Sequence, residues 1–277
     1  MRLLPGVTID HADTVLTDAS TAWTNAQGGS FGYFAAYVGA VDRTYTQLRA
    51  CFAEPDLAGA IHSDAFWHLL PAGPFPTPGA DAVLQRAYNE AYRRVIGEVI
   101  GVLDRARAEL DALKTLAERP GLALVIDTNV LHTWQRPDQI DWPAVLRGWT
   151  ETARKARLIV PLRVVDELDA QKYGDGFLAD SATKAVRWLQ QALAGRAGQS
   201  VMIRPGATAT LEVWAQGEDR GADADLAILR CAADVDALCA DGARVVTADL
   251  GMQLRAEHMG LRVRELPDMY RKKKEMK

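Results

Sequence analysis

The second half of the chain alternates short apolar runs with helical patterns. The runs show no regular polar alternation, which is typical of strands buried on both faces of a sheet. They are LALVID (122–127), RLIVP (157–161), SVMIRP (200–205), ARVVTAD (243–249) and LRVREL (261–266). Between them, apolar residues recur at helical spacing. Because strand and helix alternate, the pattern predicts an α/β fold with a mostly parallel five-stranded sheet.

The first 120 residues have a helical pattern throughout. Residues 31–53 and 64–70 carry apolar side chains at helical spacings, and the proline-rich stretch 71–80 predicts a loop or linker. A long proline-free run then leads to Pro120. Its apolar positions recur every three or four residues and predict one amphipathic helix: Val95, Val99, Val102, Ala106, Leu110, Leu113 and Leu116. This stripe suits either packing in a core or the seam of a dimer.

These patterns divide the chain into an α-helical N-terminal region (1–120), an α/β domain (121–268) and a basic C-terminal tail (269–277). The 277 residues include 32 Lys and Arg against 36 Asp and Glu, a net charge of −4. That balance excludes a strongly basic nucleic-acid coat and an acidic disordered chain. It allows an enzyme that meets nucleic acid through a local patch. Residues 1–120, with 10 basic and 14 acidic side chains, hold the whole excess.

Three further features indicate a protein of the reducing cytoplasm without a membrane anchor. No apolar run approaches the ~20 residues of a membrane helix, and the N-terminus lacks the apolar core of a signal peptide. The three cysteines form no CxxC pair, so the sequence predicts neither a disulfide framework nor a zinc site.

Acidic side chains follow several of the predicted strands. They are Asp127, Asp166, Glu167 and Asp249 after strands, and Asp223 and Asp225 at the start of an intervening helix. Each one alone is explained by helix capping, by the helix dipole or by a solvated helix face. Their recurrence at the carboxyl ends of parallel strands predicts one acidic cluster at one edge of the sheet. Such carboxylates repel unless a cation neutralises them, and oxygen ligands without His or Cys suit Mg²⁺ or Mn²⁺.

Four segments also resemble, in order, the motifs of PIN-domain nucleases. They are VIDTNVL (125–131), PLRVVDELD (161–169), DADLAIL (223–229) and VVTADLGMQLRAEHMGL (245–261). The similarity covers roughly residues 122–267 and implies a three-layer α/β/α domain. It further implies a metal-dependent endoribonuclease, in which Mg²⁺ or Mn²⁺ activates water for hydrolysis of the RNA phosphodiester.

The resemblance also assigns residues to this chemistry. The catalytic and metal-binding acids that match the motifs are Asp127, Glu167, Asp225 and Asp249, and Asp223 competes with Asp225 for the third position. Asn129 and Thr247 match positions that support the acids. All four acidic positions are filled, whereas Gly251 stands where some relatives carry a further polar group.

An RNA substrate requires cations that meet its phosphates. We expect Arg163, Lys172 and Arg255 to bind substrate, although each also suits a solvated surface. Among the aromatic residues Trp134, Trp142 and Trp149, one could stack on a base, but packing is the more economical interpretation. His132 fits no metal-ligand spacing, and we interpret it as a surface residue or as a neighbour of the ligands.

The predicted function is therefore an endoribonuclease in a bacterial cytoplasm, with a toxin or defence role left open. A structure-specific DNA nuclease is the first alternative, but the further acids and helical arch typical of such enzymes are missing between residues 127 and 167. A non-catalytic RNA-binding or scaffold protein is the second. The predicted partners are RNA, a second copy of the chain, and a protein inhibitor or regulator that binds the N-terminal helices.

Overall fold

The computed structural model describes residues 3–4, 6–28, 33–53, 56–72, 82–196, 198–215 and 223–272. The chain divides into two compact units, Met1–Leu116 and Ala117–Lys277. Most of the proline-rich segment predicted to be a loop, together with Lys273, Lys274 and Lys277 of the basic tail, lies outside the described residues. Within the described ranges, none of the helices combines the length and hydrophobicity that a membrane span requires.

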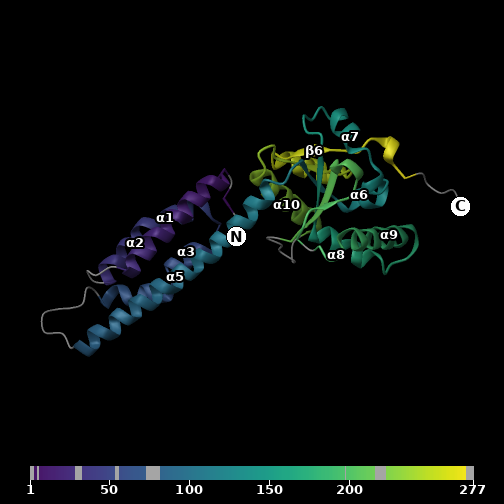
Figure 1. Cartoon of the computed structure of the whole chain (residues 1–277). Helices are drawn as coiled ribbons and strands as arrows, with labels where there is room; N and C mark the ends of the chain where they lie inside the picture. Colours follow the sequence, from purple (N-terminus) through teal and green to yellow (C-terminus); the bar gives the residue numbers. More distant parts are fainter. Residues whose placement is uncertain are drawn as a thin grey trace. The chain divides into compact units, whose positions relative to one another are not determined.

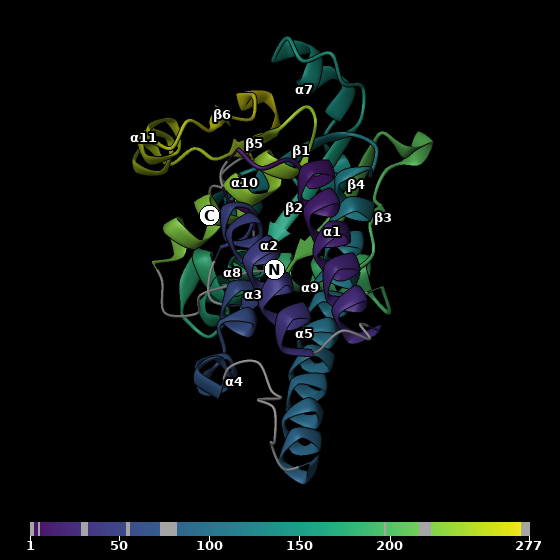
Figure 2. The same ribbon diagram turned by 90° about the vertical axis from the view of Figure 1, so that its left-hand side faces the viewer.

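The first unit consists of helices. They are α1 (Ile9–Gly28), α2 (Tyr33–Cys51), α3 (Asp56–Ile61), α4 (Asp64–Leu69), the 3-10 turn η1 (Leu70–Ala72) and α5 (Ala82–Ala117), which ends at the boundary of the unit. α1 and α2 pack against each other and lie alongside α5 (Figures 1 and 2). The N-terminal region is thus helical, as its pattern predicts.

The apolar stripe of α5 is used in the core of this unit. Val95, Val99 and Leu110 are buried together with Trp23 of α1 and Tyr37 of α2. Val102 and Leu116, which the periodicity also places on the stripe, are only half-buried. Leu103 and Ile96 are fully buried instead, so the buried face is turned slightly from the predicted one. Packing within the unit therefore accounts for the stripe.

The second unit is built on a six-stranded sheet. Its strands are β1 (Leu122–Ile126), β2 (Ala156–Pro161), β3 (Val201–Met202), β4 (Ala209–Trp214), β5 (Ala243–Val246) and β6 (Arg262–Arg264). Their order is β3-β4-β2-β1-β5-β6, and β3 alone runs antiparallel among the described strands. β1, β2 and β5 are buried at every position, as expected for strands covered on both faces.

The predicted number of five strands is wrong, because β4 does not show in the apolar pattern. Its sequence ATLEVW places Thr210 and Glu212 between apolar residues, which resembles an exposed segment. Glu212 is nevertheless buried, and its carboxylate accepts hydrogen bonds from Arg157 on β2 and from Arg119 before β1. A buried charge is tolerated when it is paired in this way. The strand predicted over 200–205 shortens to the antiparallel edge strand β3.

Among the described residues of this unit, six helices cover the sheet: α6 (Thr128–Thr133), α7 (Trp142–Gly148), α8 (Leu162–Gln171), α9 (Gly176–Leu193), α10 (Ala224–Leu238) and α11 (Leu250–His258). The chain passes from β1 to β2 to β4 in one direction across the sheet, and from β4 to β5 to β6 in the other. Since crossovers between parallel strands are right-handed, α6 to α9 cover one face, and α10 and α11 cover the other. The unit therefore has the three layers α/β/α (Figure 1).

The strand order reverses at β1, which lies between β2 and β5. In open α/β sheets, ligands bind beyond the carboxyl ends of the strands at such a switch point. α6, α8 and α11 each begin directly after a strand, and α10 returns the chain to the start of β5. All four helices consequently begin at this edge, which is where the predicted acids stand.

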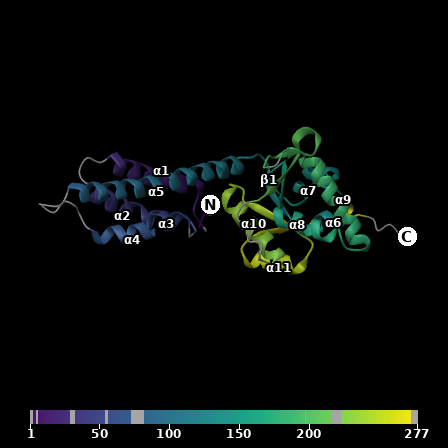
Figure 3. The same ribbon diagram turned by 90° about the horizontal axis from the view of Figure 1, so that it is seen from below.

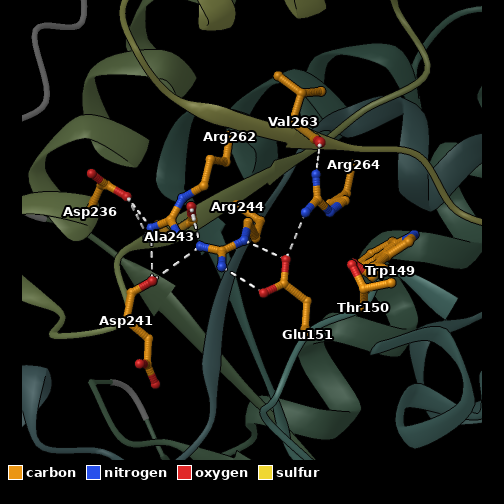
Figure 4. A network of polar contacts seen from close by, with 10 residues as sticks. All are labelled: Trp149, Thr150, Glu151, Asp236, Asp241, Ala243, Arg244, Arg262, Val263 and Arg264. Carbon is orange, nitrogen blue, oxygen red and sulfur yellow. Dashed lines mark hydrogen bonds and ion pairs between the residues drawn. The ribbon is translucent and has the colours of Figure 1, made fainter. Parts of the chain in front are cut away.

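The opposite, amino edge carries a different polar cluster (Figure 4). Glu151 accepts hydrogen bonds from Nε and Nη2 of Arg244, at 2.7 and 2.6 Å, and from Nη2 of Arg264 at 2.9 Å. Arg262 donates to the backbone oxygen of Asp241 at 2.8 Å. These contacts connect β5 and β6 to the segment before β2 and border a pocket of about 320 Å³. Within this cluster, the arginines neutralise the acids.

The pair formed by Glu212 and Arg157 predicts a large effect on stability. Glu212→Ala leaves the buried guanidinium of Arg157 without its carboxylate, so we expect the free energy of unfolding to fall by about 3–5 kcal/mol in urea denaturation. Asp138→Ala is the control, because it breaks a pair with the exposed Arg136, and its cost should be about 0–1 kcal/mol. Equal losses in the two variants would contradict this account.

Candidate active site

The structure brings the four predicted acids to the carboxyl edge of the sheet. Asp127 and Asp249 stand at the N-cap positions of α6 and α11, and Asp225 lies in the first turn of α10. Glu167 lies in the second turn of α8, which packs against both α6 and α10 (Figure 3). The acids thus come from four helices that begin at one edge.

Asp127 is not simply a helix cap. The residue is only 4% exposed, and within the described helix its side chain forms no capping hydrogen bond. Instead, Oδ2 accepts from Oγ1 of Thr247 at 2.7 Å and from Nδ2 of Asn129 at 3.2 Å. Burial raises the pKa of Asp127, and the charge of Glu167 adds to this, while the bonds from Thr247 and Asn129 act in the opposite direction.

Thr247 joins two of the acids. Its hydroxyl donates to Asp127 and accepts a hydrogen bond from the backbone amide of Asp249 at 3.0 Å. A hydroxyl can do both at once, so the Thr-x-Asp spacing places one acid beside the other. Asp249 also caps α11, where Oδ1 accepts from the amide of Met252 at 2.8 Å.

Glu167 is held by residues that the sequence interpretation did not select. Its Oε2 accepts from Oγ1 of Thr128 at 2.6 Å, and its Oε1 accepts from Nε2 of Gln171 at 3.3 Å. Oε1 of Gln171 lies 2.7 Å from Nε2 of His132, so that ring nitrogen carries the proton. Two spacings in the sequence could have pointed to these residues. Thr128 directly follows Asp127, and Gln171 lies one helical turn after Glu167.

His132 is therefore a buried neighbour of the acids and not a surface residue. Its side chain is almost fully buried, and burial lowers the pKa of its imidazole below the ordinary value. The neutral ring keeps Gln171 in place, and Gln171 in turn reaches Glu167. Of the two interpretations of His132, the neighbouring role fits the structure.

Asp223 and Asp225 occupy different positions in the same turn. Asp223 caps α10, since its Oδ1 accepts from the amide of Asp225 at 3.1 Å. Burial raises the pKa of the Asp225 carboxyl, and the charges of Asp223, Asp249 and Glu167 also raise it, whereas Arg255 lowers it. Asp225 therefore shares an electrostatic environment with two of the other predicted ligands, which favours it over Asp223.

The predicted substrate-binding cations lie in three settings. Arg163 is half-buried in the first turn of α8. Lys172, at the end of α8, forms an ion pair with Asp169 at 2.7 Å and lies 4.8 Å from the ring centroid of Tyr173. Nη1 of Arg255 lies 2.8 Å from Oδ2 of Asp225.

The three tryptophans serve packing. Trp134 and Trp142 are fully buried, and the indole of Trp142 donates to the backbone oxygen of Pro137. Trp149 is half-buried and donates to the backbone oxygen of Glu265 at 3.0 Å. None of the three presents an open face like that of a base-stacking platform within the described residues.

The donor chemistry of this edge fits a hard divalent cation. The candidate ligands offer carboxylate oxygens without His or Cys, as Mg²⁺ and Mn²⁺ prefer, and the charge of Glu167 contributes to the raised pKa values of Asp127 and Asp225. Across the part of the chain that is described, however, no three such side chains stand close enough together to hold one ion. Asp225, for example, is engaged by Arg255.

Comparison with known proteins identifies a family for the second half of the chain. Residues 124–266 match the family described as PIN domain. Eight chains of solved structures match, among them one titled a domain of a functionally unknown protein from Methanocaldococcus jannaschii DSM 2661. It is 15% identical, the match covers 53% of this chain and 91% of that chain, and the TM-score is 0.34. No curated protein matches the sequence.

The burial of Asp127 predicts a stability that depends on pH. Because the folded-state pKa lies above the unfolded value, stability falls as pH rises from the unfolded pKa through the folded one. Asp127→Asn removes the buried charge, so in EDTA at neutral pH this variant should melt at a higher temperature than the wild type. The difference should shrink as pH approaches the ordinary carboxyl pKa of about 4. Asp166→Asn, at an exposed neighbour of Glu167, is the control, and a less stable Asp127→Asn protein at neutral pH would contradict the account.

Proposed function

Since the chain belongs to the PIN-domain family, whose members are in general nucleases that use divalent metal ions, we propose that it is a metal-dependent endoribonuclease. The observation that carries the proposal is the buried carboxylate of Asp127, which Thr247 and Asn129 hold at the switch point of the sheet. A buried charge beside further acids costs stability in the absence of a cation. Function explains such an arrangement better than folding does.

In this proposal, Asp127, Glu167, Asp225 and Asp249 hold Mg²⁺ or Mn²⁺. When bound, the ion supplies Lewis acidity that lowers the pKa of water and offsets negative charge at the phosphodiester. The protein's own task is to direct the carboxylates, and the bonds from Thr247 and Asn129 offset part of the cost of ionising the buried Asp127. Asp223 caps α10 and stays a neighbour of this set.

Two groups of residues orient the acids. Asn129 and Thr247 hold Asp127, and the hydroxyl of Thr247 also accepts from the backbone of Asp249. Thr128 and Gln171 hold Glu167 through both of its oxygens. Partners of this kind fix the direction of metal ligands and typically change affinity or activity by about 10- to 100-fold when they are removed.

Cations around the edge would meet the RNA backbone. We propose Arg163, Lys172 and Arg255 for this role, in which they neutralise phosphates without reading sequence. We also propose that the helices of residues 1–120 position or regulate the nuclease, through a second copy of the chain or a protein inhibitor. A toxin or defence role would be consistent with such regulation.

The acids predict the outcome of a cleavage assay. Wild-type protein should cut labelled single-stranded RNA in Mn²⁺ or Mg²⁺ and lose that activity in excess EDTA. Asp127→Asn and Glu167→Gln should each lower the rate by about 10²–10⁴-fold, because each removes an ionised ligand. Gel analysis of the initial rates, with melting temperatures recorded for each variant, checks this expectation.

Asp166→Asn is the matched control, since it removes an exposed acid directly beside Glu167 and should leave the rate within about twofold of the wild type. Full activity of Asp127→Asn or undiminished activity in EDTA would contradict the proposal. Single-stranded and flap-bearing DNA of the same sequence form the second arm. Preferential cutting of DNA would establish the DNA nuclease instead, and RNA binding without cutting of either substrate would establish the scaffold.

A further inference from the structure

The guanidinium of Arg255 lies on the acids of α10. Nη1 of Arg255, on α11, is 2.8 Å from Oδ2 of Asp225 and 3.7 Å from Oδ2 of Asp223. Arg255 follows Asp249 by six residues, so it belongs to the same helix as the fourth candidate ligand. Asp225, the third candidate ligand, is thus already paired with a cation of the protein itself.

The ion pair between Arg255 and Asp225 can be broken at a small cost in free energy. The side chains of Arg255 and Asp225 are 54% and 40% exposed. Exposed pairs of this kind change an equilibrium constant by about fivefold at most. A divalent ion carries twice the charge of the guanidinium and interacts with several carboxylates at once, so it can replace Arg255 on Asp225.

The same pair bears on how Asp225 could bind an ion. Among the described residues, no three candidate ligands stand close enough to hold one ion, and Asp225 is already paired with Arg255. A guanidinium and a metal ion on one carboxylate would also repel each other. Loading the site therefore requires Asp225 to turn from Arg255 toward the other acids.

We propose that Arg255 competes with the metal ion for Asp225 and, once released, binds a phosphate of the substrate. The proposal rests on the proposed function and adds to it a coupling between ion and substrate. A released guanidinium on α11, beside the acids of α10, offers the paired donors that suit a phosphate. Because binding couplings are reciprocal, the ion raises the affinity for RNA and RNA raises the affinity for the ion.

The test is a titration of the full chain with Mn²⁺ in the absence of RNA, in which calorimetry measures the binding. Arg255→Gln removes the competitor, so it should bind Mn²⁺ about 3- to 10-fold more tightly than the wild type. The same variant should show about a 10-fold higher KM for single-stranded RNA, because the released phosphate ligand is gone. A merely structural arginine would not shift the two quantities in opposite directions.

Arg262→Gln is the matched control, because it removes one positive charge from an exposed pair with Asp236 at the other edge of the sheet. It should leave the Mn²⁺ affinity within about twofold of the wild type. Equal or weaker Mn²⁺ binding by Arg255→Gln would overturn the inference alone, as would an equal gain in Arg262→Gln. Absence of Mn²⁺ binding by the wild type would overturn the proposed function together with this inference.

Discussion

A carboxylate buried at the end of the central strand is the constraint on which this site depends. β1 lies between β2 and β5, so Asp127, which follows β1, is enclosed by the sheet and the helices that begin there. Burial penalises its charge, and the hydroxyl of Thr247 offsets part of that penalty. The pairing of β1 with β5 is what brings Thr247 to Asp127, because the two strands end side by side.

Acidic residues have different partners at the two edges of the sheet. Toward the amino edge, arginines neutralise the acids: the half-buried Glu151 meets Arg244 and Arg264, and the buried Glu212 within β4 meets Arg157. At the carboxyl edge, the topology begins four helices whose first turns favour acids singly, and together these acids repel. In the described structure, Arg255 offsets part of this repulsion from the exposed rim. In the proposed function, a divalent cation would offset the rest of this negative charge.

Much of this arrangement follows from residue order. The apolar runs mark the buried parallel strands, and parallel strands bring their carboxyl ends to one edge, so the proximity of Asp127, Glu167 and Asp249 could be predicted. β4 could not, because Glu212 makes the strand look exposed until Arg157, 55 positions away, is known to pair with it. One of the six strands therefore depended on a contact that no local pattern contains.

The supporting contacts were harder to predict than the acids. Thr128 reaches Glu167 only because α8 packs against α6, a long-range contact without a local sequence signal. Gln171 reaches Glu167 within α8 itself, but its one-turn spacing is shared by many helical pairs. The family resemblance favours Asp225 over Asp223, but local pattern alone does not separate them, since either can begin a helix. Their roles separate only when one side chain caps α10 and the other faces Arg255.

The most direct test of the account is anomalous diffraction from crystals of the full chain grown with Mn²⁺. The account predicts a peak at the carboxyl edge of the sheet, bounded by carboxylates of Asp127, Glu167, Asp225 and Asp249, with Arg255 withdrawn from Asp225. A peak bound elsewhere, for example by Asp236 and Asp241 at the amino edge, or an edge without manganese at saturating concentration, would contradict it.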